Sequence, residues 1–487
     1  MPLILPGNVA SATASTTFSV DNSCRINRAD SPSLTRDQSA SPTHDDKGTL
    51  SFWFKIGNLS SGDGHYFFSV FTDSDNRMQM YLGSDNTLRL IQKTGGSTVL
   101  NLVTNRVFKD PSAWYHLVIA CDSSQGTAAN RIKIYINGVQ ETSFSTETYL
   151  DQNEDIQLVK GTEVCLGAYN KASPSDFLDA YLAEMVLIDG TQNAVTDFGE
   201  FDSDSPTIWK PIDVSGLTFG TNGFYLDFED SADLGDDESG NTNDFTETNL
   251  DATDQCQDSP TNNFPTLNIL DNAQSDATYS EGNLKWATTT DSHYFWGRST
   301  IGMSAGKWYF EAKLTSAAEH NGIGICVDGP DNNTTFLANG GVNDEFEWLY
   351  KNNTGNQHNN TGSSSYGDSY TTGDIIGVYL DLDNNKLYFA KNGTIQNSGT
   401  GISITAPAST STGNYFFCIS DRTNGSSTTL EVNFGGCPAF AISSGNTDAN
   451  DYGNFEYDPS DGGGSSFDSA AKDFLALCTK NLGSDGG

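Results

Sequence analysis

The chain has 487 residues, in which 63 Asp and Glu outnumber 25 Lys and Arg to give a formal net charge of -38. Such an acidic protein lacks the clustered cations that bind nucleic-acid phosphates, so nucleic acid is excluded as a class of partner. No apolar stretch approaches the length of about 20 residues that spans a bilayer, so we expect no membrane insertion. The length predicts two or three domains rather than one core.

Turn-forming and aromatic residues dominate the composition. There are 48 Gly, 28 Phe and 19 Tyr, with abundant Asn, Ser, Thr and Asp. Short aromatic strands separated by frequent turns are typical of all-β proteins, so we predict an all-β fold of tandem antiparallel sandwiches.

Strand-like alternation begins at residues 48–56, where Leu50, Phe52 and Phe54 share one face. Similar runs continue to about residue 190, separated by Gly, Asn, Asp and Ser clusters, and a second series covers about 282–436. Residues 134–139 and 387–393 each contain a strand ending in Asn-Gly, the pair that favours a type I′ hairpin.

These patterns define the expected domain organisation. The acidic Gly- and Asn-rich segment reads as a connector that contains one strand able to return to the first sandwich, and FDSAAKDFLALCTKNL predicts one short amphipathic helix near the end. The expected divisions are a first sandwich with a polar N-terminal segment (1–212), a connector (213–275), a second sandwich (276–440) and a C-terminal tail (441–487).

Two family resemblances give these sandwiches a more specific fold. TLSFWFKI, then WYHLVIACDSSQGTAANRIKIYING, then AYLAEMVLIDG resemble the laminin G-like, concanavalin A-like fold over about residues 45–195. GKWYFEAKL (306–314), NGIGICV and DIIGVYLDLDNNKLYFAKNG (374–393) resemble the SPRY domain, another concanavalin A-like sandwich. Both resemblances imply jelly-roll sandwiches used for binding.

The order of parts also resembles structural proteins of tailed-phage virions of the marine type. The matching segments are FGEFDSDSPTIWKP (198–211), TNGFYLDFEDSADLGDDESGNTNDF (221–245), DSPTNNFPTLN (258–268) and the closing ALCTKNL. This resemblance implies an external appendage, such as a tail fibre, capsid fibre or decoration. Its partners would be other virion proteins, a host glycan or receptor, and further copies of the chain. A bacterial surface adhesin is the alternative.

Localisation follows from the same resemblance. The N-terminal MPLILPGNVASATAS has no basic region and only a short apolar run, so we expect no signal peptide. A virion protein is made in the host cytoplasm and reaches the virion exterior by assembly. Cys121, Cys165 and Cys326 lie in apolar strand-like runs, where we expect buried free thiols.

Calcium is the one cofactor that the sequence suggests. Laminin G-like domains often hold Ca²⁺ at a rim, and Asp73, Asp75 and Asp122 could supply the hard oxygen ligands it prefers. Asp and Asn serve turns more often, so a solvated turn is the competing interpretation.

Glycan or partner binding is expected at aromatic and amide side chains in the second half. Aromatic rings stack on sugars while Asn and Asp orient the hydroxyls. The SPRY resemblance implicates rim loops, here within 329–372. Packing inside the core or between virion subunits, with a purely architectural role, is the alternative. The candidate residues are Trp348, Tyr350, Asn352, Asn353, Tyr366, Asp368 and Tyr370.

Catalysis is not expected. Glucanases on this fold carry Glu-x-Asp-x-Glu on one strand, and the nearest sequence here, at 344–348, has Glu345 and Glu347 without the central Asp. Motifs of serine hydrolases, phosphate-binding loops and zinc proteases do not occur.

Overall fold

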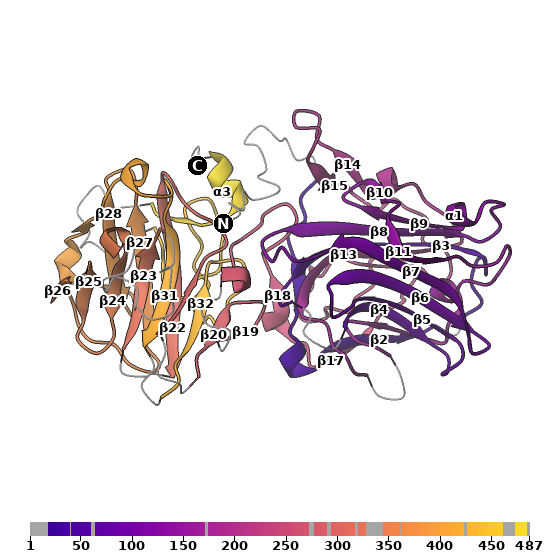
Figure 1. Ribbon diagram of the computed structural model, residues 1–487, viewed down its shortest axis with the longest axis horizontal. Coiled ribbons are helices and arrows are strands. Elements are labelled where there is room, and N and C mark those ends of the chain that lie inside the picture. Colours follow the sequence, from indigo (N-terminus) through magenta and orange to yellow (C-terminus); the bar gives the residue numbers. More distant parts are fainter. Residues whose placement is uncertain are drawn as a thin grey trace. The chain divides into compact units, whose positions relative to one another are not determined.

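The computed structural model describes residues 18–38, 40–59, 64–170, 174–271, 277–289, 294–316, 320–327, 344–360, 362–422, 426–460 and 473–484. These residues form two compact units that divide between Thr261 and Asn262. Each unit is a sandwich of two β-sheets with only short helices, which confirms the all-β tandem fold (Figure 1). Among the described residues, no helix is long and apolar enough to cross a membrane.

The first sandwich contains two eight-stranded antiparallel sheets. One has the order β10 (Val139–Glu141), β9 (Ile132–Ile136), β8 (Trp114–Asp122), β3 (Lys47–Ile56), β13 (Ala180–Asp189), β1 (Ser23–Ile26) and β18 (Gln255–Cys256), with β16 (Phe224–Leu226) also paired to β13. The other has the order β11 (Phe144–Thr148), β7 (Ser97–Val107), β6 (Thr87–Thr94), β5 (Arg77–Leu82), β4 (His65–Phe71), β12 (Glu163–Leu166), β2 (Ser33–Asp37) and β17 (Thr246–Thr248).

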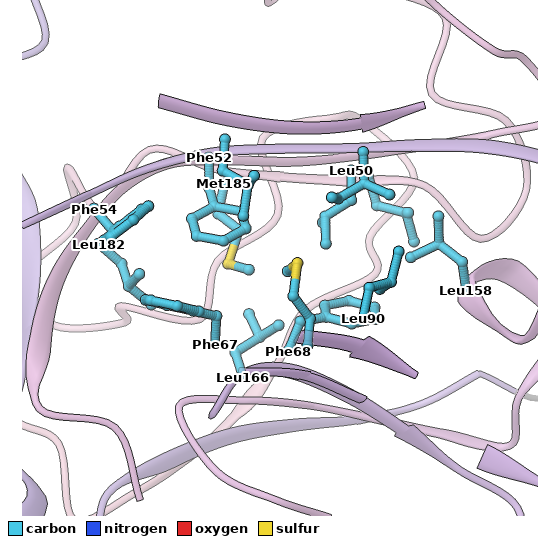
Figure 2. Close-up of a cluster of buried hydrophobic side chains, with 14 of the residues drawn as sticks. Leu50, Phe52, Phe54, Phe67, Phe68, Leu90, Leu158, Leu166, Leu182 and Met185 are labelled. Atoms are coloured by element: carbon cyan, nitrogen blue, oxygen red, sulfur yellow. The ribbon is translucent and has the colours of Figure 1, made fainter. Parts of the chain in front are cut away.

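The core between these sheets follows the predicted alternation. Leu50, Phe52 and Phe54 of β3 point toward Phe67 and Phe68 of β4 in the facing sheet (Figure 2). Successive strand residues point to opposite faces, so the intervening residues of β3 lie on the outer face. Cys121 and Cys165 are free and buried, as expected.

That outer face is covered rather than exposed. Val118 of β8 and Val186 of β13 pack there against Phe198, Val214 and Phe219. Residues 213–261, which the sequence analysis placed in a connector, therefore form part of this sandwich and supply β16, β17 and β18. The segment folds back because β13 and its neighbours are apolar on both faces.

The second sandwich is also built from two sheets. One has the order β19 (Thr278–Ser280), β20 (Lys285–Ala287), β32 (Thr429–Asn433), β22 (Lys307–Ser316), β27 (Ile375–Asp381), β28 (Lys386–Lys391) and β29 (Thr394–Ile395), with β30 (Ile402–Ser403) on β28 and β33 (Leu475–Ala476) parallel to β22. The other has the order β21 (Tyr294–Arg298), β31 (Phe416–Arg422), β23 (Asn321–Cys326), β24 (Trp348–Lys351), β25 (Asn356–Asn359) and β26 (Gly362–Ser365).

The predicted Asn-Gly turns occur in both sandwiches. Asn137 and Gly138 have φ values of 47° and 77°, and Asn392 and Gly393 have 48° and 73°. Positive φ at both central residues is the property that a type I′ turn requires. Both turns are therefore formed as the sequence predicts.

The C-terminal segment covers the outer face of the second sandwich. Phe455 and Phe474 pack on Tyr309 and Tyr379, which alternate with the inward-facing residues of β22 and β27. The expected amphipathic helix begins within 461–472, outside the described residues. The part that is described contains the strand β33 and then the short helix α3 (Thr479–Ser484). The expected tail is thus packed onto the sandwich.

Candidate binding site

Two of the predicted glycan-binding aromatics lie on β24 and face the interior. Trp348 and Tyr350 are 6% and 0% exposed. Tyr350 stacks on Phe389 with 5.1 Å between ring centroids, and Trp348 meets Tyr415 edge-on at 6.0 Å. Strand alternation places both rings between the sheets, so Tyr350 offers no face on which a sugar could stack. This corrects the expectation of exposed aromatic platforms.

Tyr366 and Tyr370 are also buried, and both are held by main-chain contacts. The Tyr370 hydroxyl donates to the Tyr350 carbonyl at 2.9 Å, and the Phe389 N–H donates to the Tyr366 hydroxyl at 3.3 Å. The Tyr350 hydroxyl in turn donates to the Asp368 carbonyl. These bonds fasten the loop over 366–370 to the sandwich, which is a structural role.

The three polar candidates have different environments. Asn352 is buried, and its side-chain oxygen accepts the Asn321 N–H at 2.8 Å. Asn353 and Asp368 are exposed and remain available to a ligand. Most of the first half of the predicted 329–372 insertion, up to residue 343, lies outside the described residues.

A cleft of about 530 Å³ lies at one edge of the second sandwich, lined by residues of β24, β25 and β26 of one sheet and of β30 of the other. It brings together Trp348 and Tyr366, whose ring edges reach it, with a set of uncharged polar residues. Its volume is within the usual range of about 300–1,000 Å³ for ligand sites. The remaining lining residues are Gln357, Asn359, Gly362, Ser363, Ser364, Ser365, Asn397, Gly401, Ile402 and Ser403.

One serine hydroxyl in this cleft is oriented by a hydrogen bond. Ser364 accepts it from the Gln357 amide at 2.7 Å, and the two residues are paired across the β25–β26 hairpin. Because the Ser364 hydroxyl already uses its oxygen as an acceptor, its own hydrogen is left to donate to a ligand. Ser363 accepts from Asn356 at 3.1 Å on the opposite face of the hairpin, because successive strand residues point to opposite faces. Ser403 accepts from the Lys386 ammonium at 2.8 Å and points away from its neighbour Ile402.

Sequence reasoning did not identify these serines. The sequence pattern around these serines is weak. It looks like a loop over Asn356–Asn359 and Gly362–Ser365, although these segments pair as the β25–β26 hairpin. All four residues of β26 are exposed, so no alternation of apolar and polar residues marks it as a strand.

Two of the three proposed calcium ligands, Asp73 and Asp122, accept hydrogen bonds within their own turns, and Asp75 donates its backbone N–H to Asp73. Asp73 accepts the backbone N–H groups of Asp75 and Asn76, both at 2.8 Å. Asp122 accepts the Ser124 N–H at 3.0 Å and the Gln125 side chain at 2.7 Å. Within the described ranges, no group of three or more His, Cys, Asp or Glu residues is arranged to hold a metal ion. The geometry corresponds to Asx turns.

A serine and a histidine meet inside the first sandwich, but in an orientation unsuited to catalysis. The Trp209 indole N–H donates to His116 Nδ1 at 2.9 Å, so the neutral ring carries its hydrogen on Nε2. Nε2 lies 2.9 Å from Ser51 Oγ and therefore donates to it. Burial lowers the pKa of His116 to about 3, which keeps the ring neutral. A ring that donates to Ser51 cannot remove its proton.

The acidic pair nearest to a glucanase motif is also separated. Glu345 lies in a 3-10 turn and is exposed, whereas Glu347 follows that turn and is 0% exposed. The two carboxylates therefore do not share one strand face, although residues two apart on a strand would do so. Asn359 donates to the backbone carbonyls of both residues, so the segment acts as packing for β25.

Comparison with known families identifies both sandwiches. Residues 29–194 match the concanavalin A-like lectin/glucanases superfamily, and residues 286–435 match the SPRY domain. The chain therefore carries a laminin G-like, concanavalin A-like domain followed by a SPRY domain. These are binding-type, lectin-like jelly rolls.

Curated relatives match only a small part of the chain. ATP-dependent RNA helicase DDX1 of Xenopus laevis is 34% identical over 96 residues, which is 20% of this chain and 12% of the helicase. Ran-binding protein 9 of Homo sapiens is 31% identical over 94 residues, which is 19% of this chain and 12% of that protein. The chain thus spans about an eighth of the length of these relatives.

Solved structures with similar chains include sandwiches of several kinds. The SPRY domain of human HERC1 is 14% identical with a TM-score of 0.28, and the match covers 36% of this chain and 99% of that one. The SAP-like pentraxin of Limulus polyphemus is 17% identical with a TM-score of 0.28, over 36% of this chain and 80% of that one.

Proposed function

We propose that the chain is a structural protein of a phage virion, displayed in an external appendage, and that it binds a ligand on the host surface. The observation that carries the binding role is the uncharged cleft of the second sandwich, in which Gln357 orients the Ser364 hydroxyl beside Trp348 and Tyr366. Support for the virion role comes from the resemblance of segments 198–211, 221–245 and 258–268 to virion proteins. Other virion proteins and further copies of the chain are the proposed structural partners.

The proposed role is binding without catalysis. The Ser51–His116 pair donates in the wrong direction for a nucleophilic serine, and Glu345 and Glu347 are not positioned as an acid and a base. The proposed location is the virion exterior, which the chain would reach by particle assembly in the host cytoplasm.

The experiment has two parts. Mass spectrometry of purified particles of the encoding phage is expected to detect the chain in stoichiometric amounts. Purified full-length chain carrying a fluorophore is expected to bind host cells, and the cleft variant Ser364→Asp is expected to reduce this binding. Absence of the chain from particles would contradict the virion role, and equal binding by wild type and variant would contradict the cleft as the binding site.

A purely architectural subunit is the second candidate. The burial of Tyr350, Tyr366 and Tyr370 favours it, because these rings stabilise the sandwich instead of facing solvent. An architectural subunit would be present in particles, whereas its isolated form would bind neither host cells nor glycans.

A further inference from the structure

The cleft lined by Trp348, Tyr366 and the β25–β26 hairpin also carries information about the chemistry of its ligand. The inference below rests on the proposed binding function and concerns only the class of ligand. Among the described residues that line the cleft, none is charged. Amide and hydroxyl groups and the Trp348 indole N–H supply the side-chain polarity of the lining.

These groups combine donors and acceptors in close proximity. The hydroxyl of Ser364 accepts from Gln357 and retains a hydrogen to donate. The Gln357 amide donates to Ser364 through its nitrogen, and its carbonyl oxygen accepts no hydrogen bond among the described residues. A ligand that satisfies this cleft must therefore both accept and donate hydrogen bonds, as sugar hydroxyls do.

The apolar part of the lining is narrow. Trp348, Tyr366 and Ile402 are 6%, 5% and 9% exposed, so each presents only an edge. Small apolar edges can pack against the C–H groups of a pyranose ring, whereas they provide no deep pocket for a bulky apolar side chain. Peptides that add to an edge strand such as β26 obtain specificity from such side-chain pockets.

The negative charge of the protein favours neutral ligands over anionic ones. The chain has a net charge of -38, so an anionic ligand approaches against the overall field of the protein. The nearest cation shown by a contact is Lys386, whose ammonium is bound to the Ser403 hydroxyl at 2.8 Å. A neutral ligand avoids this repulsion and uses the amide and hydroxyl groups directly.

We infer that the cleft between the β25–β26 hairpin and residues 397–403 binds a neutral, hydroxyl-rich oligosaccharide. The Ser364 hydroxyl donates to a sugar oxygen, and Gln357 accepts from a sugar hydroxyl. Loss of one such neutral hydrogen bond costs about 0.5–1.5 kcal/mol, so Ser364→Ala is expected to weaken binding by about two- to twelve-fold.

The test uses labelled full-length chain on one array of three probe classes. These are unsubstituted hexose oligosaccharides, sulfated or uronate-containing oligosaccharides, and extended peptides. Ser364→Asp introduces a carboxylate into the cleft, and Ser411→Asp introduces the same charge at an exposed serine outside it. Circular dichroism and thermal unfolding establish that both variants remain folded.

The inference predicts binding to neutral oligosaccharides that Ser364→Asp reduces at least about ten-fold and Ser411→Asp leaves unchanged. Binding to anionic oligosaccharides that Lys386→Met abolishes would overturn it, as would selective binding to peptides. If the chain binds host cells in a manner sensitive to Ser364→Asp but binds no neutral oligosaccharide, the ligand class is wrong and the proposed binding function stands.

Discussion

The ammonium of Lys55 lies 2.7 Å from the carboxylate of Asp258, and the two side chains are 0% and 2% exposed. The indole of Trp114 donates to the other oxygen of the same carboxylate at 3.0 Å. Lys55 belongs to β3 and Asp258 follows β18, so the contact joins residues 203 positions apart. It explains how a lysine can lie on a strand whose outer face is covered.

Removal of one partner is expected to destabilise the first sandwich strongly. Lys55→Met leaves the Asp258 carboxylate buried without its cation, which typically costs about 3–5 kcal/mol. Urea unfolding of the full-length chain measures the change in the midpoint of the transition that belongs to this sandwich.

Lys160→Met is the matched control, because Lys160 also forms ion pairs but is 38% exposed. Solvent screens these two surface ion pairs, so their loss is expected to change stability by no more than about 1 kcal/mol. Equal effects of the two substitutions would show that the Lys55–Asp258 pair does not hold the segment in place.

Two buried histidines should make the first sandwich sensitive to acid. Burial lowers the pKa of both His65 and His116 to about 3. Between pH 6.5 and 3 the unfolded chain protonates these rings while the folded chain does not, so stability falls as the pH falls through this window. Each ring contributes a slope of about 1.4 kcal/mol per pH unit within this window.

Urea unfolding at a series of pH values tests this slope. His116→Gln is expected to lower stability at pH 7 because the hydrogen bonds to Ser51 and Trp209 change. The free energy of unfolding of the variant should also depend less steeply on pH between 6.5 and 3, because one of the two histidines no longer contributes. An unchanged slope would mean that His116 is protonated in the folded protein.

Glu184 should make the first sandwich less stable as the pH rises, which is the opposite of the effect of the two histidines. Burial raises the pKa of this carboxyl to about 8, although it accepts a hydrogen bond from the Tyr225 hydroxyl at 2.9 Å. The folded protein therefore keeps a proton that the unfolded chain releases above about pH 4.5. The stability that this proton supplies is full below pH 4.5 and is lost as the pH rises through 8.

Glu184→Gln replaces the protonated carboxyl with a neutral side chain of similar size. We expect the variant to become more stable than the wild type as the pH rises from 6 to 8, with little difference near pH 4.5. Glu147→Gln, at an exposed position on β11, is the control and should follow the wild-type profile. Parallel profiles for wild type and Glu184→Gln would contradict an uncharged Glu184.

Tyr350 is expected to contribute to stability more than to ligand contact. Its ring packs on Phe389, Tyr366 and Tyr370, so Tyr350→Ala should destabilise the second sandwich by about 3–5 kcal/mol. Asn353→Ala, at an exposed position nearby, should change stability by less than about 0.5 kcal/mol. Thermal unfolding compares them, and a Tyr350→Ala variant as stable as wild type would return that ring to the list of ligand-binding candidates.

Local patterns predicted much of the fold because local physics determines those features. The alternation of Leu50, Phe52 and Phe54 predicts the inward face of β3, and Asn-Gly at 137–138 and 392–393 predicts turns with positive φ. In the segment expected to be a connector, one strand was predicted to return to the first sandwich, as β16 does, but β17 and β18 were not predicted. The residues of this segment fold back because the outer faces of β3, β8 and β13 are apolar, and one-dimensional alternation does not reveal which segment covers them.

The candidate site was predicted only in part. Trp348 and Tyr366 were identified and do reach the cleft, but their burial depends on contacts with Tyr415 and Phe389, which are distant in the sequence. The polar serines of β26 resemble any solvated turn until the facing segment at 397–403 is in place. Long-range packing therefore determines which polar residues can bind a ligand.

The central claim proposes a binding protein displayed on the exterior of a phage particle, and one cryo-EM reconstruction of intact particles of the phage proposed to encode the chain tests it most directly. The account predicts density for both sandwiches on the particle exterior, with the cleft beside Trp348 and Ser364 open to solvent. A particle that lacks the chain, or one in which a neighbouring subunit fills this cleft, would contradict it.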